Sequence, residues 1–354
     1  MKNLLDFTLD ELKDQLSPPF RAKQIFEWLY KKNATSFDEM LNLPKDLRAN
    51  LAQEFYLDPL KCVKFEQSAD GSIKYLFELK DGLRIESVLL PMKEEISDEN
   101  GEVARHARYT ICVSSQVGCR MGCSFCASTL NGCVRNLYAA EMLGQIIAVN
   151  HYLAERGRVG HVVLMGSGEA LDNYEETMRF LRMAHDENLL GISYRNISLS
   201  TCGLVPQMMR FLEEDIPVTL SISLHATSDE KRREIMPIAK VYSLSELMGA
   251  ARAYVKKTGR RVIFEYAAMA GVNSSREDAQ ALAALLKNLQ CHVNVIPLNK
   301  ISERDLEAPS QAKINQFIQH LESLGVSVSK RRSMGTDIEG ACGQLRNKLI
   351  HNLS

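Results

Sequence analysis

The stretch "HVVLMG" at residues 161–166 and the stretch "YEETMRFLRMAHDE" at residues 174–187 together decide the fold. The first is an almost continuous apolar run that ends in a glycine, which is typical of a strand buried on both faces. The second repeats apolar residues at helical spacing with charged residues between them, which is typical of an amphipathic helix. A buried strand followed by such a helix predicts a βα unit, and βα units associate into a parallel sheet.

The same alternation recurs on both sides of this unit. It begins with "YTICVSS" at 109–115 and a helix at 139–155, and it ends with "VSVSKRR" at 326–332. The other predicted strands occupy 195–201, 217–224, 261–269 and 292–298, and the other predicted helices occupy 205–215, 243–257, 276–289 and 310–325. About six such units are too few to close an eight-stranded barrel. The sequence therefore predicts an α/β fold, either a partial (β/α)6 barrel or an open doubly wound sheet.

Two smaller regions precede these units. Residues 1–58 contain short amphipathic stretches such as "RAKQIFEWLYKK" at 21–32, which predict a small helical domain. In residues 59–108, Asp70-Gly71 and Asp81-Gly82 are hairpin signals, so "KYLFEL" at 74–79 and "RIESVLL" at 84–90 should pair as antiparallel strands. The polar stretch at 93–108 predicts a flexible loop. We therefore expect an N-terminal helical domain (1–58), a hairpin region (59–108), the barrel (109–332) and a C-terminal segment (333–354).

Composition limits the class of protein. The 354 residues include nine cysteines and carry a formal net charge of −1. A long chain with an odd number of cysteines and no export signal argues against a disulfide framework, and no run of eighteen apolar residues occurs. We therefore expect a cytoplasmic protein with no membrane association. Basic residues cluster at 256–261 and 330–332, and such clusters usually form solvated faces.

Four of the cysteines fall in one short stretch, "CVSSQVGCRMGCSFCAS" at residues 112–128, in which Cys119, Cys123 and Cys126 follow the pattern CxxxCxxC. Three thiolates on one loop can each bind one iron of a [4Fe-4S] cluster and leave the fourth iron open. A structural zinc site is the alternative, with Cys112 or Cys133 as its fourth ligand. Three buried structural thiols are disfavoured, because the loop offers them little apolar shelter.

Polar and glycine residues follow several of the predicted strands, where folds of this class bind ligands. Gly168 and Glu169 end the second strand, and the ends of later strands contribute Ser200, Ser223, His225 and Asn299. Glycine lets a ligand approach the backbone closely, and a carboxylate can accept a hydrogen bond from an ammonium group. Each residue is weak evidence alone, but together they predict a ring of ligand contacts around the barrel mouth.

These motifs together resemble the radical S-adenosylmethionine (SAM) superfamily, in which CxxxCxxC is followed by a GE dipeptide at the second strand. The longer strings "CVSSQVGC", "STCGLVP", "SLHA", "GVN" and "ACGQL" look like the RlmN/Cfr family of RNA adenine methyltransferases. The likeness runs from about residue 20 to residue 345, which is nearly the whole chain. It implies a radical SAM partial barrel.

The resemblance also implies roles for individual residues. A [4Fe-4S] cluster is held by Cys119, Cys123 and Cys126, and its open iron binds SAM. Further SAM contacts come from the strand ends, at Gly168, Glu169, Ser200, Ser223, Leu224, His225 and Asn299. Two further family cysteines carry out the chemistry, and they correspond to Cys342 in "ACGQL" and to Cys112. A proton acceptor of the family corresponds to Glu86 in "RIESVLLP".

The implied reaction uses two SAM molecules per turnover, because an adenine ring carbon is not nucleophilic and a radical is needed. One SAM methylates Cys342, and the second is cleaved reductively to a radical that takes a hydrogen from the S-methyl group. The carbon radical adds to adenine C2, and Cys112 then attacks the Cys342 sulfur, so that the methylated base leaves and a transient disulfide forms. The implied partners are 23S rRNA, the anticodon loop of tRNA, and an electron donor such as flavodoxin or ferredoxin.

Two positions depart from the family pattern. Ala170 stands where the C2 enzymes usually have proline, and alanine there also occurs in Cfr, the C8 enzyme; Ser274 stands where aspartate is usual. The strings "CASTLNG" and "STCGLVP" look more like the C2 enzymes, so we expect C2 methylation, with C8 methylation as the alternative. A radical SAM enzyme with a non-RNA substrate is the rival class. The test is to neutralise four basic residues, Arg21, Lys23, Lys31 and Lys32. Loss of tRNA binding in that variant would exclude the rival class.

The remaining cysteines have simpler interpretations. Cys62, Cys202 and Cys291 lie in apolar runs or at strand ends and are predicted core thiols, whereas the role of Cys133 stays open. His225 is expected to stack on a cofactor or bond to it, because no partner ligand for a metal accompanies it.

Overall fold

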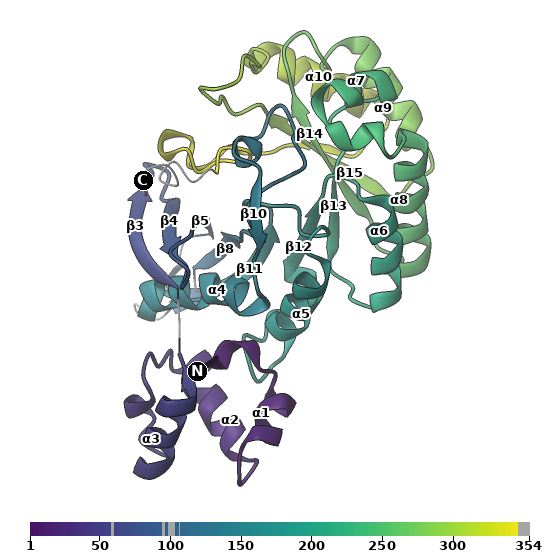
Figure 1. The fold of residues 1–354 in the computed structure, drawn as a ribbon. Coiled ribbons are helices and arrows are strands. Elements are labelled where there is room, and N and C mark those ends of the chain that lie inside the picture. The colour runs from purple at the N-terminus through teal and green to yellow at the C-terminus, as the bar shows by residue number, and fades with distance from the viewer. Residues whose placement is uncertain (58–59, 94–95, 98–102, 106, 346–354) are drawn as a thin grey trace.

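A computed structural model describes residues 1–57, 60–93, 96–97, 103–105 and 107–345. Its centre is a ten-stranded sheet in the spatial order β16-β15-β14-β13-β12-β11-β8-β5-β4-β3 (Figure 1). The strands from β8 to β16 in this sheet run parallel and follow one another in chain order. They are β8 (Arg108–Cys112), β11 (Val159–Leu164), β12 (Ile197–Thr201), β13 (Thr219–Ser223), β14 (Val262–Ala268), β15 (Cys291–Pro297) and β16 (Val328–Lys330).

Helices follow the parallel strands and cover one face of the sheet (Figure 1). They are α4 (Ala139–Leu153), α5 (Tyr174–His185), α6 (Val205–Phe211), α7 (Asp229–Ile235), α8 (Leu244–Thr258), α9 (Arg276–Leu286) and α10 (Gln311–Ser323). Every residue of β14 is buried, as expected for a strand with both faces covered. The predicted partial (β/α)6 barrel is confirmed, with β16 as a final strand after the sixth unit.

The predicted hairpin is present, but it is not a separate layer. Strand β4 (Ile73–Glu78) pairs antiparallel with β3 (Lys61–Gln67) and with β5 (Arg84–Lys93). Strand β5 then pairs antiparallel with the first barrel strand, so that Val88 lies opposite Cys112. The hairpin therefore extends the barrel sheet, which the turn signals alone could not indicate because they specify only local pairing.

Two short ladders lie beside this sheet. Within the expected flexible loop at 93–108, β6 (Ile96–Ser97) pairs antiparallel with β7 (Val103–Arg105), and residues 94–95, 98–102 and 106 lie outside the described residues. Beyond β8, β9 (Gln116–Gly118) pairs with β10 (Cys133–Asn136) and frames the cysteine loop.

The N-terminal residues form short helices whose apolar side chains are continuous with the core of the barrel. These are α1 (Leu9–Gln15), α2 (Arg21–Phe26) and α3 (Lys45–Glu54), and a two-residue ladder joins β1 (Lys2–Asn3) to β2 (Phe55–Tyr56). They pack where the barrel strands begin, because Arg158, just before β11, donates to the carbonyl of Tyr30 at 2.7 Å. Figure 1 shows them at the opposite end of the molecule from the C-terminal segment. Within the described residues, no helix is both long and apolar enough to cross a membrane.

One buried side chain joins α4 to the two strands that carry the hairpin and the first cysteine. The Oε1 atom of Gln145 accepts hydrogen bonds from the Ser87 hydroxyl at 2.5 Å and the Ser114 N–H at 2.9 Å. Its Nε2 atom donates to the Ser114 carbonyl at 2.9 Å. Because Ser114 lies two residues after Cys112, this amide fixes the chain where it enters the cysteine loop.

Replacing Gln145 with leucine should lower the free energy of unfolding by about 3 kcal/mol, because three buried polar groups would lose their partner. Urea denaturation followed by circular dichroism measures this change. The matched control is Gln280→Leu on the exposed face of α9, which should stay within about 0.5 kcal/mol of the parent. Equal stability of the two variants would show that the Gln145 contacts do not stabilise the fold.

Candidate active site

Two adjoining cavities lie in the barrel: one at the carboxyl ends of the strands, and one that reaches from Cys112, at the end of β8, back to Ser198, near the start of β12. The smaller, of about 150 Å³, is lined by all three cysteines of the CxxxCxxC loop. Its wall also holds most of the strand-end residues expected from the sequence, namely Gly168, Glu169, Ser200, Ser223, His225 and Asn299. Leu224 does not line it, since its side chain is fully buried in the barrel core. The structure therefore gathers the predicted cluster ligands and six predicted cofactor contacts around one space.

The cysteine loop is held by backbone contacts. Gly118 ends β9 with a φ of +81°, and a Cβ atom there would lie 2.0 Å from the carbonyl oxygen of Gly132. The next amide, that of Cys119, donates to this same carbonyl at 2.8 Å. Only glycine fits a positive φ at such a close approach, so Gly118 fixes the start of the loop relative to β10.

Without a positive charge nearby, the three buried thiols do not readily lose their protons. Burial raises the pKa of Cys119 to about 12, and burial together with the neighbouring Cys126 and Cys119 raises the pKa of Cys123 well above its ordinary value. Bound iron ions would supply that positive charge, since a metal-bound thiol is deprotonated. The loop therefore suits a metal centre rather than three free thiolates.

Three thiols around one cavity suit a four-iron cluster, in which each thiolate binds a different iron and the ligands surround a volume. A single zinc ion would need a fourth ligand beside the same thiols. Of the two candidates for that ligand, Cys112 lines the neighbouring cavity, whereas Cys133 pairs with Gly118, next to Cys119.

Glu169 and Gly168 occupy a tight backbone corner after β11. The Glu169 carboxylate accepts the N–H of Cys202 at 2.7 Å and that of Leu171 at 3.2 Å, and its own N–H donates to Gln116 at 2.9 Å. Burial raises the pKa of Glu169. Gly168 has a φ of +111°, and a Cβ atom there would lie 2.7 Å from side-chain atoms of Gln116. A cationic group of a ligand could offset the buried carboxylate charge.

His225 faces the same cavity as a neutral ring. Its Nδ1 atom accepts the N–H of Ala267 at 2.9 Å, which leaves the ring proton on Nε2. Burial, followed by the charge of Arg232, lowers the pKa of His225 to about 3. The ring meets Phe125 of the cysteine loop edge-on, with centroids 4.6 Å apart. His225 therefore offers a hydrogen-bond donor and a ring face to a ligand.

The C-terminal segment folds back onto the cysteine loop and carries Cys342 into the site. The carbonyl of Gly343 accepts the N–H of Ala127 at 2.7 Å, and the carbonyl of Leu345 accepts the Ser128 hydroxyl at 2.7 Å. The amide of Asn299 donates to the Cys342 carbonyl at 3.0 Å. Cys342 consequently lines both cavities.

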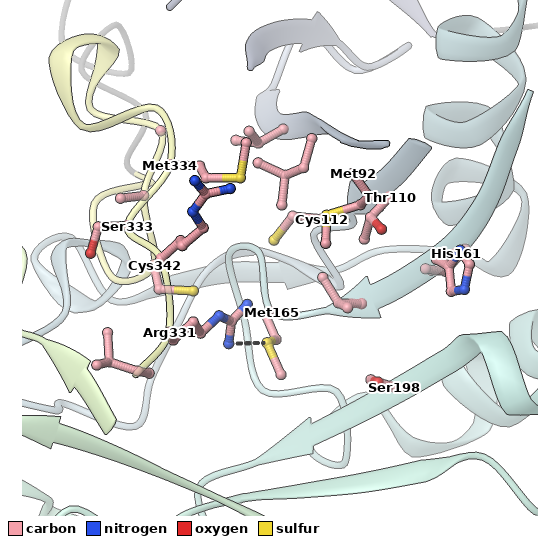
Figure 2. Close-up of a pocket in the computed structure, with 18 of the residues that line it drawn as sticks. Met92, Thr110, Cys112, His161, Met165, Ser198, Arg331, Ser333, Met334 and Cys342 are labelled. Atoms are coloured by element: carbon pink, nitrogen blue, oxygen red, sulfur yellow. Dashed lines mark hydrogen bonds between the residues drawn. The ribbon is translucent and has the colours of Figure 1, made fainter. Parts of the chain in front are cut away.

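The larger cavity, of about 380 Å³, brings Cys342 together with Cys112. The two sulfurs point into the same space from opposite walls (Figure 2). Cys112 packs against Val88 and Leu345, and burial, followed by the charge of Cys342, raises its pKa to about 12. All nine cysteines lie in the described part of the chain, and none of them is in a disulfide.

Sequence reasoning missed a cation beside this pair. Arg331 was expected on a solvated face, but it lines both cavities and donates to Glu265 at 3.2 Å and to the Met165 sulfur at 3.3 Å. The charge of Cys342 is the largest cause that raises the pKa of Arg331. Glu265 could have indicated a buried cation, because a carboxylate within the apolar run of β14 requires a buried partner.

Glu86 stands apart from both cavities. It lies on the same face of β5 as Val88, and its carboxylate is 3.8 Å from the ammonium of Lys74. It lines a small separate cavity beside Ala127 and Ser128 of the cysteine loop.

The other cysteines follow the sequence expectations only in part. Cys202 is buried as predicted, and Cys291 is half-buried. The prediction for Cys62 is wrong: it is exposed, because β3 is the edge strand of the sheet and most of its residues face solvent.

Comparisons with known proteins agree with this geometry. The family model of the radical SAM superfamily matches residues 113–286, and that of the ribosomal RNA large subunit methyltransferase N-terminal domain matches residues 2–57. The dual-specificity RNA methyltransferase RlmN of Campylobacter concisus is 52% identical, covering 98% of this chain and 92% of that protein. The probable dual-specificity RNA methyltransferase RlmN of Clostridium perfringens is 47% identical, covering 99% and 98%.

A solved structure shares the whole architecture. The crystal structure of a radical SAM methyltransferase from Sphaerobacter thermophilus superimposes with a TM-score of 0.90 at 43% identity, and it covers 98% of this chain and 99% of that one. The likeness therefore includes the N-terminal helices, the barrel and the C-terminal segment. On these matches and on the geometry above, the chain belongs to the radical SAM superfamily and, within it, to the RlmN family of RNA methyltransferases.

Proposed function

We propose that this protein methylates C2 of an adenine in 23S rRNA and in the anticodon loop of tRNA. The relatives are named dual-specificity RNA methyltransferases, which supports RNA as the substrate class. The observation that carries the proposal is the pair Cys112 and Cys342, which face one cavity while Cys342 also borders the cavity of the cysteine loop. A single thiol that reaches both spaces can receive a methyl group on one side and deliver it on the other.

The smaller cavity is assigned to the cofactors. Cys119, Cys123 and Cys126 would hold a [4Fe-4S] cluster, and the Glu169 carboxylate and the His225 N–H would orient SAM. When bound, the cluster and SAM supply the methyl group and the radical chemistry that an unreactive ring carbon requires. Two SAM molecules per turnover, one for each purpose, complete this proposal.

The two remaining cysteines would act in sequence. The Cys342 thiolate accepts a methyl group by displacement and becomes a thioether, which then carries the one-carbon unit to the adenine as a covalent bridge. The Cys112 thiolate attacks the Cys342 sulfur, so that the carbon–sulfur bond breaks, the methylated base leaves and a disulfide forms. A cellular reductant must return two electrons to that disulfide. Burial and the charge of Cys342 raise the pKa of Cys112, and the cation of Arg331 opposes that rise, so Arg331 favours the attacking thiolate.

Several finer assignments belong to the same proposal. Glu86 would accept a proton, and its place on the face of β5 that carries Val88 supports this role. Ala170 is buried, and its carbonyl accepts a hydrogen bond from Thr177 at 2.8 Å. Because alanine stands here where the C2 enzymes usually have proline, C8 methylation is the alternative. Flavodoxin or ferredoxin would supply the electrons, and rRNA and tRNA substrates would place the protein in the cytoplasm.

The N-terminal helices are assigned to RNA binding. Lys23, Lys31 and Lys32 are exposed there, Phe20 is 57% exposed, and the Lys32 ammonium lies 4.0 Å from the Trp28 ring centroid. Basic residues interleaved with aromatic ones suit a phosphate backbone and unstacked bases.

Exchanging Cys119, Cys123 and Cys126 for alanine together should remove the brown colour and the bound iron of anaerobically purified protein, because all three thiolates would be lost. Absorbance spectra with iron and sulfide quantitation measure this. Cys133→Ala is the control and should keep full iron, since Cys133 lines neither cavity. A colourless parent protein that contains one zinc would contradict the cluster assignment.

Replacing Cys342 with alanine should stop methyl transfer at its first step, because no thiolate accepts the methyl group. Replacing Cys112 should act later and leave RNA covalently attached to the protein, visible as a shifted band on a denaturing gel. Mass spectrometry should then find a one-carbon bridge between Cys342 and adenine. The exposed Cys62→Ala is the control and should turn over normally. Normal turnover of the Cys112 variant would exclude the two-cysteine mechanism.

Exchanging Lys23, Lys31 and Lys32 for glutamine should weaken RNA binding roughly tenfold and flatten its salt dependence, because phosphate contacts release counterions. Fluorescence anisotropy of a labelled RNA across a salt series measures both quantities. The matched control exchanges Lys256 of α8, Lys287 just after α9 and Lys313 of α10, which are also exposed. If both variants bind alike, the N-terminal helices are not the RNA-binding surface.

A further inference from the structure

The larger cavity extends beyond the two cysteines to a polar end. Thr110, His161 and Ser198 line it there, together with Arg195 and Asn196, and Figure 2 shows the first three on the far side of Cys112 from Cys342 and Arg331. Thr110 pairs with His161, whereas Val163 pairs with both Cys112 and Ser198, so Ser198 lies level with Cys112 but two strands away. Thr110 thus lies two residues before Cys112, roughly 7 Å along the strand.

His161 is prepared for a ligand at this end. Its Nδ1 atom is buried and forms no hydrogen bond with any described residue. Burial, followed by the charge of Arg108, lowers the pKa of His161, so the ring stays neutral and offers one donor and one acceptor. The hydroxyls of Thr110 and Ser198 can donate or accept. Because Nδ1 has almost no exposed surface, Nε2 is the ring nitrogen left for a ligand in the cavity.

The walls between the two ends are apolar. Val88 of β5 and Val163 of β11 line the cavity on either side of Cys112, and Leu90 of β5 lines it beside Thr110. Apolar walls with a few polar groups at one end are typical of a site for a flat heterocycle. No step proposed for Cys112, Cys342 or Glu86 uses this polar end.

We infer that Thr110, His161 and Ser198 bind the edge of adenine that carries N6 and N7, and so select adenine as the reacting base. This inference rests on the proposed function. When C2 of adenine faces Cys342, N6 and N7 lie on the opposite edge of the purine and point toward the polar end. Adenine presents a donor at N6 and an acceptor at N7, which matches a neutral imidazole flanked by hydroxyls. These three residues are specificity-determining and take no part in the bond-making steps.

The test is an internal competition between two RNAs that differ only at the methylated position. One carries adenine, and the other carries purine, which lacks the N6 amine. Both compete for the same loaded enzyme, so the ratio of the products does not depend on how much of a variant holds its cofactors. The intrinsic reactivity of each base is common to all variants and cancels when their ratios are compared.

His161→Leu should lower the preference for adenine over purine by about tenfold to a hundredfold relative to the parent, the range expected for a lost pair of base contacts. Thr110→Val, which keeps the side-chain shape, should lower it less. His161→Gln, which retains a donor and an acceptor, should restore much of it. His151→Leu, on the exposed end of α4, is the control and should keep the parent ratio.

An unchanged ratio in both His161→Leu and Thr110→Val would overturn the inference while leaving the methylation itself intact. If His161→Leu does not turn over, the ratio of Thr110→Val decides. Failure of the proposed function looks different, because the parent protein would then methylate neither RNA. A 7-deazaadenine substrate tests the N7 contact in the same competition, and the parent should disfavour it.

Discussion

The site depends on the hydrogen bonds that hold the backbone of the C-terminal segment against the cysteine loop and Asn299. The carbonyls of Gly343 and Leu345 accept from Ala127 and Ser128, and Asn299 holds the carbonyl of Cys342. The contacts with the cysteine loop join parts of the chain more than two hundred residues apart. They matter because, apart from the short 3-10 helix η9 (Thr336–Ile338), the described part of the C-terminal segment has no helix or strand that could position Cys342.

The opposite wall is fixed by strand β8, which has different partners on its two edges. It pairs parallel with β11 and antiparallel with β5, so Cys112 sits where the barrel joins the hairpin. The buried ion pair of Arg331 and Glu265 then sets the charge beside both sulfurs, and Asn294 adds a hydrogen bond to Glu265 at 3.0 Å. A buried charge is tolerated only when it is paired in this way.

Sequence patterns were sufficient where chemistry or periodicity is local. The CxxxCxxC spacing, the strand-end residues such as Glu169 and His225, and the βα alternation all follow from short stretches, and the structure confirms the barrel that positions them. Long-range pairing was not accessible in this way. Turn signals at Gly71 and Gly82 predicted the hairpin but not its union with β8, and the charge cluster at 330–332 gave no sign that Arg331 turns inward. Cys62 was misplaced because an apolar run on an edge strand resembles one in the core.

The position of Cys342 in a wall shared by two cavities has a consequence for how such a protein can diverge. The residues that surround the cysteine loop and those that line the far end of the larger cavity are separate sets, joined mainly by Cys342, Arg331 and their neighbours. Substitutions at Thr110, His161 or Ser198 therefore leave the cofactor cavity intact. The two ends of the site can in this way change independently during evolution, because a substitution at one end does not alter the wall of the other.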